Sequence, residues 1–262
     1  MNQIELYKRL PKTNCGDCPQ KACLPFSFSV IKGEAELADC PHLTDEEREL
    51  ISGDLIRSDW REELIVKMKE EVQKIDFASV AEGLGARLTD AGLVLPCLGR
   101  MFTISPEGEV TTQGHITPWV KILLLHYLRT CGSGPLADRW VSFTELKDGM
   151  MKSTAFHREC EDPLRRLLDS NPQPVGMILR RLGAEVREDF PTPHAWHLLL
   201  LPKVPIVILF WPPEEEFESK VKILFDATAD KFLDVESLVF LVEGLVKNIE
   251  MFLSLDKKKH IC

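Results

Sequence analysis

The sequence lacks a long, uninterrupted apolar run. Its longest apolar stretch, "HLLLLPKVPIVILFW" (197–211), is broken by Pro202, Lys203 and Pro205. A helix that crosses a membrane needs about 20 apolar residues, so this stretch is too short. The first ten residues, "MNQIELYKRL", also have no apolar core of the kind that secretory signals carry. We therefore expect no membrane span and a cytoplasmic setting, where the thiols are reduced.

A basic surface and a catalytic signature are also missing. The chain has 32 Lys and Arg against 41 Asp and Glu, a net charge of −9, so nucleic acid is not expected as a partner. It contains no Gly-x-Ser-x-Gly, no phosphate-binding P-loop and no zincin motif. These patterns leave open whether the protein is an enzyme.

The length and composition favour a small module followed by a larger domain. With 262 residues, 44% of them hydrophobic, the chain can bury a large core. We expect a metal-binding module in 1–43, a helical connector in 44–82, an α+β domain with an antiparallel sheet and packed helices in 83–254, and a frayed tail in 255–262.

Local patterns predict the individual elements. Thr44 before three acids marks a helix start, and apolar spacing predicts a helix over 58–75. Short apolar runs after residue 83 predict a β-meander. Beyond it we expect a buried helix over 117–130, two helices over 162–183, strands in 197–211 and 220–226, and a last helix over 234–253 that Asp234 caps.

Four of the eight cysteines lie within 26 residues, at Cys15, Cys18, Cys23 and Cys40. Clustered thiolates in a reducing setting indicate a soft-metal site, either zinc or an iron–sulfur cluster. Structural zinc sites usually pair two short Cys-x2–4-Cys segments. Three clustered cysteines and a distant fourth are more typical of a cluster, and Pro41 after the last one fits the same pattern.

The residues between these cysteines are consistent with a cluster. Gly16 lets the backbone turn back between the first two cysteines. Pro25 suits the start of a helix after Cys23, and Gly33 suits its end. The N-terminus of that helix would face the cluster, and Phe26 and Phe28 would exclude water from it.

Residues 9–43 resemble the four-cysteine [4Fe-4S] domain of the corrinoid iron–sulfur protein large subunit. The resemblance includes "LPKTNCG", Cys18, "CL", Phe26, "GEAEL" and "DCP", and it departs from the family at "PQK" (19–21). It implies one [4Fe-4S] cluster on the four cysteines. It also implies low-potential, one-electron transfer to a redox partner protein or a corrinoid protein in anaerobic metabolism.

The remainder resembles a domain of unknown function that follows this module in anaerobic bacteria and archaea. The resemblance rests on segments such as "ILLLHYL" (122–128), "WVSFTELKDGM" (140–150) and "ILFDATADKFL" (223–233). No activity can be transferred from that family to individual residues.

Two further hypotheses stay open beside electron transfer. The cluster could be structural or regulatory in a redox-sensing module that binds a ligand or a partner. Alternatively, the larger domain could contain an enzyme active site, which would need a pocket with convergent polar groups. Weaker candidates are a metal shared by His157 and Cys160, and a ligand pocket beside a polar loop over 143–158 that includes Gly149.

Overall fold

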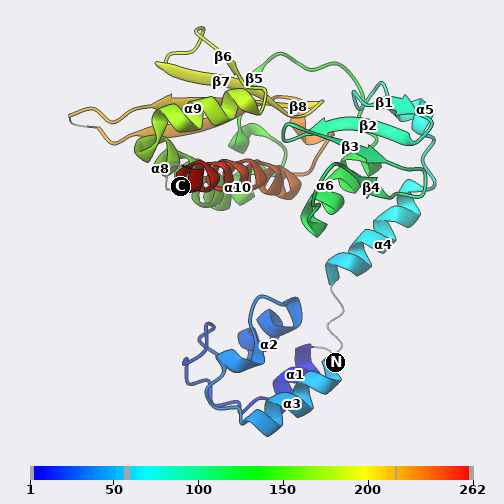
Figure 1. Cartoon of the computed structure of the whole chain (residues 1–262), viewed down its shortest axis with the longest axis vertical. Helices are drawn as coiled ribbons and strands as arrows, with labels where there is room; N and C mark the ends of the chain where they lie inside the picture. Colours follow the sequence, from blue (N-terminus) through cyan, green and yellow to red (C-terminus); the bar gives the residue numbers. More distant parts are fainter. Residues whose placement is uncertain (1–2, 56–59, 216, 260–262) are drawn as a thin grey trace. The chain divides into compact units, whose positions relative to one another are not determined.

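The computed structural model describes residues 3–55, 60–215 and 217–259. The chain divides into two compact units, residues 1–66 and 67–262 (Figure 1). Helix α4 (Trp60–Val72) begins in the first unit and ends in the second. The fold is α+β, as predicted. The predicted limits at residues 43 and 82 stay predictions.

The first unit is built from short helices around one small core. It contains α1 (Gln3–Arg9), α2 (Cys23–Lys32), the 3₁₀ turn η1 (Leu37–Asp39) and α3 (Asp45–Asp54). Thr44 caps α3 as predicted, because its Oγ1 accepts a hydrogen bond from the Glu47 amide at 3.2 Å. The core of the first unit consists of ten buried residues: Leu6, Leu10, Cys23, Phe26, Val30, Ala35, Leu37, Cys40, Leu43 and Ile51.

The second unit begins with the predicted β-meander. After the short helix α5 (Phe77–Val80), the strands β1 (Arg87–Thr89), β2 (Gly92–Cys97), β3 (Arg100–Ile104) and β4 (Val110–Thr111) pair antiparallel in sequence order. Each turn falls at a signal that the sequence carries. Leu98 and Gly99, for example, both have positive φ, 50° and 76°, in the two-residue turn between β2 and β3.

A second, five-stranded antiparallel sheet has the strand order β5-β9-β8-β7-β6. Its strands are β5 (Trp140–Ser142), β6 (Glu185–Val186), β7 (His194–Leu201), β8 (Val204–Trp211) and β9 (Lys220–Asp226). Strands β7 and β8 form the predicted hairpin, with Pro202 and Lys203 in its turn.

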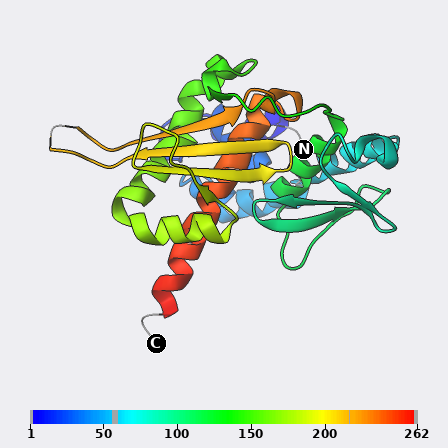
Figure 2. The same ribbon diagram turned by 90° about the horizontal axis from the view of Figure 1, so that it is seen from above.

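Helices lie on one side of this sheet (Figure 1). They are α7 (Gly149–Phe156), the π-helical turn η3 (His157–Glu161), α8 (Asp162–Ser170), α9 (Pro172–Arg181) and α10 (Val235–Lys259). The sheet is seen face-on in Figure 2, with α10 crossing behind it. On the other face, side chains of the sheet and of Phe190 cover Ala195, Val207 and Leu209.

The buried helix predicted over 117–130 is α6 (Pro118–Arg129). Its five buried residues include Tyr127, whose hydroxyl donates to the Leu84 carbonyl at 2.8 Å and accepts from the Lys203 amide at 3.2 Å. This side chain therefore links α6 to the segment before β1 and to the β7–β8 turn.

Two expectations about local structure are wrong. Residues 143–158 are mostly helical and do not form a polar loop, because Ser142 and Glu145 form a capping box that starts the 3₁₀ turn η2 (Phe143–Glu145), and α7 follows. Helix α10 continues to Lys259, beyond the predicted end at 253, because "SLDKKK" contains no Gly or Pro to stop it. The predicted frayed tail therefore begins inside this helix, and residues 260–262 lie outside the described part.

Candidate metal centre

The four candidate cysteines come from three segments of the first unit. Cys15 and Cys18 lie in the loop between α1 and α2, Cys23 is the first residue of α2, and Cys40 follows η1. Cys15 is exposed and Cys18 is half-buried, whereas Cys23 and Cys40 are buried in the core. The set therefore reaches from the interior of this unit to its surface.

Cys15 lies between two residues with positive φ. Asn14 has φ 48° and Gly16 has φ 81°, a region that asparagine and glycine tolerate best. A Cβ on Gly16 would meet nothing closer than 3.8 Å, so the glycine is needed for its conformation and not for space. The turn predicted at Gly16 is present.

Asn14 also fixes the start of α2. Its Oδ1 accepts a hydrogen bond from the backbone amide of Cys23 at 2.9 Å. This amide is one of the donors that a helix N-terminus leaves without a partner. No sequence signal predicted this role for Asn14, because the bond joins residues nine apart and is not a local turn.

Cys18 is near enough to the other three candidate cysteines to interact with their charges. Burial, a hydrogen bond with Cys40 and the charges of Cys40, Cys15 and Cys23 together raise the pKa of Cys18 to about 12. All seven cysteines of the described residues are free thiols. A bound cation or a cationic iron centre would stabilise thiolates whose charges oppose one another in this way.

Positive groups surround the buried end of this set. The Arg48 guanidinium donates from Nη2 to the Cys40 carbonyl at 2.8 Å. Its buried Nε–H has no hydrogen-bond acceptor among the described residues, and it therefore remains available as a donor. The α2 N-terminus at Cys23 adds a helix dipole of the same sign. These residues fit a group whose four thiolate ligands bring net negative charge.

The two phenylalanines of α2 have different environments. Phe26 is 1% exposed in the core, as predicted, whereas Phe28 is 40% exposed and Leu24 is 38% exposed. Of the two phenylalanines, only Phe26 lies in the core with the buried cysteines. Gly33 ends the helix as predicted, in the left-handed conformation with φ 73°.

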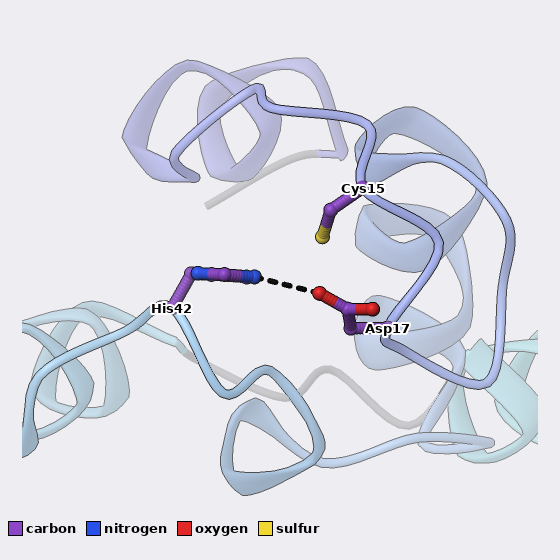
Figure 3. Close-up of side chains that lie close together, drawn as sticks. All are labelled: Cys15, Asp17 and His42. Carbon is purple, nitrogen blue, oxygen red and sulfur yellow. Dashed lines mark hydrogen bonds and ion pairs between the residues drawn. The ribbon is translucent and has the colours of Figure 1, made fainter.

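Two polar residues that the sequence analysis did not single out lie beside Cys15. One ligand atom from each of Cys15, Asp17 and His42 falls within 4.8 Å of the others, and Figure 3 shows the three side chains pointing toward one another. His42 Nε2 lies 2.8 Å from Asp17 Oδ2. Hydrogen bonds from His42 and from Cys15 lower the pKa of Asp17. The signal was present in "CGDC" and "CPH", which place both residues next to cysteines.

These three residues are the ligands that the zinc alternative would use, since thiolate, imidazole and carboxylate all bind zinc. It shares Cys15 with the four-thiol set, and all three of its residues are exposed. The four-thiol set has the more buried position and the positive surroundings, which favour it as the metal centre.

The weaker candidates do not form a site. His157 and Cys160 lie in η3 but face different surroundings: the His157 side chain is 66% exposed, and the buried Cys160 thiol donates to the Val239 carbonyl at 3.5 Å. They do not converge on a shared metal. Cys97 is a buried thiol whose pKa burial raises to about 12, as expected for a small apolar residue.

The comparisons with known proteins match both parts of the chain. Residues 76–248 match the family described as "Domain of unknown function (DUF3786)", which covers more than half of the chain. The chain therefore belongs to the DUF3786 family. Residues 10–42 match a second family, described as "Putative Fe-S cluster". This range contains all four candidate cysteines and supports an iron–sulfur cofactor.

The curated relatives match only in the first unit. The corrinoid/iron–sulfur protein large subunit of Moorella thermoacetica is 44% identical over 48 residues, which are 18% of this chain and 11% of that protein. The acetyl-CoA decarbonylase/synthase complex subunit gamma of Methanothermobacter thermautotrophicus is 44% identical over 46 residues, 18% of this chain and 10% of that protein. The chain thus spans about a tenth of the length of these relatives, and the resemblance to the corrinoid iron–sulfur family is confirmed for this module.

No solved structure matches the chain significantly. Among the described residues, every helix is too short or too polar to cross a bilayer.

Proposed function

We propose that Cys15, Cys18, Cys23 and Cys40 bind one [4Fe-4S] cluster, and that the protein transfers single electrons at low potential to a redox partner. The observation that supports the proposal is that Cys18 interacts with the charges of Cys15, Cys23 and Cys40, all of them free thiols, near the N-terminus of α2 and Arg48. The family match over residues 10–42 supports the same cofactor. A bound [4Fe-4S] cluster supplies a one-electron redox centre.

The residues around the proposed cluster have different roles. Cys23 and Cys40 hold the buried side of the site inside the core, where Phe26 excludes water. Cys15 is exposed and marks the side from which electrons can leave. Arg48 and the α2 N-terminus stabilise negative charge, so they favour the reduced state and raise the potential relative to a site without them.

The relatives suggest the metabolic context. Their names place them in corrinoid and acetyl-CoA decarbonylase/synthase proteins. We propose that this protein acts in anaerobic corrinoid or one-carbon metabolism, in the cytoplasm, with a corrinoid protein or another redox protein as its partner.

Anaerobic purification of the full chain tests the cofactor. We expect a brown protein with iron and acid-labile sulfide in equal amounts, about four of each per chain, and an electron paramagnetic resonance signal after reduction. Serine variants of the four cysteines should lose this signal. Cys131→Ser is the matched control, because Cys131 is an exposed thiol outside the set. A colourless protein with one zinc and no sulfide would contradict the proposal.

A variant of His42 separates the cluster from the zinc alternative. In the four-thiol set His42 is a neighbour and not a ligand, so His42→Ala should keep the full iron content. If the metal were held by Cys15, Asp17 and His42, the same substitution would remove it.

One observation favours redox sensing as a second function. Cys23 and Cys40 belong to the core of the first unit, so loss of the cluster would disturb the fold of that unit. Rapid electron delivery from the reduced protein to a corrinoid protein, with the fold unchanged, supports electron transfer. A change in partner affinity on cluster loss, without such delivery, supports sensing.

A further inference from the structure

A groove of about 390 Å³ lies in the second unit, between α9 and the strands β6, β7 and β8. This volume is within the range of small-molecule sites, roughly 300–1,000 Å³. The groove contains none of residues 143–158, the segment in which the sequence analysis expected a pocket.

One wall is a single face of α9. Residues 172, 173, 176, 177 and 180 line it, at the spacing of three and four that places side chains on one side of a helix. Gly176 lies in the middle of this wall, where the helix backbone comes close to the sheet: a Cβ there would lie 3.8 Å from Cζ2 of Trp196. Met177, 63% exposed, gives this wall an adaptable apolar surface.

The opposite side carries three aromatic rings. His194 and Trp196 are two residues apart on β7, and Phe210 of β8 is the cross-strand partner of His194, so the three rings share one face of the sheet. The His194 ring lies nearly parallel to that of Trp196, at 8° with 5.8 Å between centroids, and at 24° and 6.0 Å to that of Phe210. Trp196 and Phe210 are buried and His194 is exposed, so His194 is the ring on which a flat ligand can stack.

The polar groups at the groove are cationic or neutral. Arg180 and Gln173 line it, are exposed, and form no side-chain hydrogen bond or ion pair with another described residue. No Asp or Glu is among the residues that line it. By contrast, the guanidinium of the next residue, Arg181, lies 5.3 Å from the ring of Phe252. Arg180 is thus available to pair with an anionic group, and nothing in the lining opposes that charge.

We propose that this groove is a binding site for a planar aromatic anion, whose ring stacks on the exposed ring of His194 and whose carboxylate or other acidic group pairs with Arg180. Gln173 supplies a further hydrogen bond to a polar substituent. This site is independent of the cluster proposal, because every residue in it belongs to the second unit.

Two naphthalene probes test the proposal on the full, anaerobically purified chain. The probes are 2-naphthoate and its neutral analogue 2-naphthamide, and calorimetry or ligand-observed NMR gives the dissociation constants. We expect 2-naphthoate to bind more tightly than 2-naphthamide. Arg180→Gln should weaken the binding of 2-naphthoate by about tenfold, as expected for a charge-assisted hydrogen bond, and leave 2-naphthamide unchanged.

Two more variants locate the site. Gly176→Leu places a side chain over Trp196 and should abolish the binding of both probes, while leucine favours the helix more than glycine does, so the fold is retained. Arg181→Gln is the matched control with the same loss of charge on the same helix, and it should bind both probes as the wild type does. Failure of 2-naphthoate to bind, or equal binding by the wild type and the Arg180 and Gly176 variants, would overturn the proposal.

Discussion

The two units of this chain differ in what their hydrophobic cores contain. The core of the first unit contains ten buried residues, and two of them are the candidate ligands Cys23 and Cys40. The second unit packs helices on a five-stranded sheet, and its buried cysteines, Cys97 and Cys160, belong to a much larger apolar core. We expect a small core that includes proposed metal ligands to depend on the metal, and a large apolar core not to.

Removal of the metal is expected to have the largest effect, and only on the first unit. Structural four-ligand metal sites contribute on the order of 10 kcal/mol, more than a core of ten residues can replace. After anaerobic chelation of the full chain, hydrogen exchange should show loss of protection in α2 and around Cys40. The amides of β7, β8 and β9 should stay protected.

Cys23→Ser should reproduce this result without a chelator, and Cys131→Ser should not. Protection of α2 that survives complete loss of iron would show that the first unit folds without its metal, and the comparison between the units would then fail.

The second largest effect is expected from a cavity in the second unit. Leu245 is fully buried on α10, and Leu245→Ala should cost about 2–5 kcal/mol in the free energy of unfolding. Denaturant unfolding followed by hydrogen exchange should locate the loss in the second unit, with the cluster absorbance unchanged in native conditions. Glu250→Ala, an exposed change on the same helix, should stay within about 0.5 kcal/mol.

Much of the fold follows from local sequence signals. Thr44 and Asp234 mark the starts of two helices, and the turns of the meander fall where Gly and Asp predict them. Each of these signals acts over a few residues, so the sequence alone is enough to identify it.

Features made by distant segments could not be predicted in this way. The Asp17–His42 pair joins residues 25 apart, and the groove combines α9 with strands that follow it. The π-helical turn η3 places the buried Glu161 where its carboxylate accepts from the Ile223 amide at 3.3 Å and from Lys222 Nζ at 3.0 Å. Tertiary packing determines such contacts, and no local pattern specifies them.

A smaller effect is expected from the buried hydroxyl of Tyr127. Tyr127→Phe removes the hydrogen bonds of the hydroxyl with the buried Leu84 carbonyl and the half-buried Lys203 amide, at a cost of about 1–3 kcal/mol. Burial also raises the pKa of Tyr127, so the folded state favours the neutral phenol. That stabilisation is complete below the ordinary value of about 10 and is lost as the pH rises further.

Thermal unfolding at neutral and alkaline pH measures both consequences. The wild type should lose stability above about pH 10 more steeply than Tyr127→Phe, which has no phenol at this position to ionise. Parallel losses in the two proteins would assign the alkaline effect to other groups.

The smallest effect is expected at the start of α10. Asp234 caps this helix through the Ser237 amide at 2.7 Å and pairs with His126 Nε2 at 3.0 Å, and the hydrogen bond with His126 is the main cause of a lowered pKa for Asp234. Because the folded pKa lies below the ordinary value of about 3.9, the stabilisation is present above that value and is lost as the pH falls below it.

Asp234→Asn keeps a good capping residue and removes only the charge, so it should cost less than about 1 kcal/mol near neutral pH. The difference from the wild type should shrink in acid, as the carboxylate of the wild type is protonated. Thermal unfolding from about pH 7 to pH 2 measures it, and a constant difference would show that His126 does not stabilise the charge. The Asp234 charge adds only a small increment to the stability of a large apolar core, whereas in the first unit two of the proposed ligands, Cys23 and Cys40, are part of the core itself.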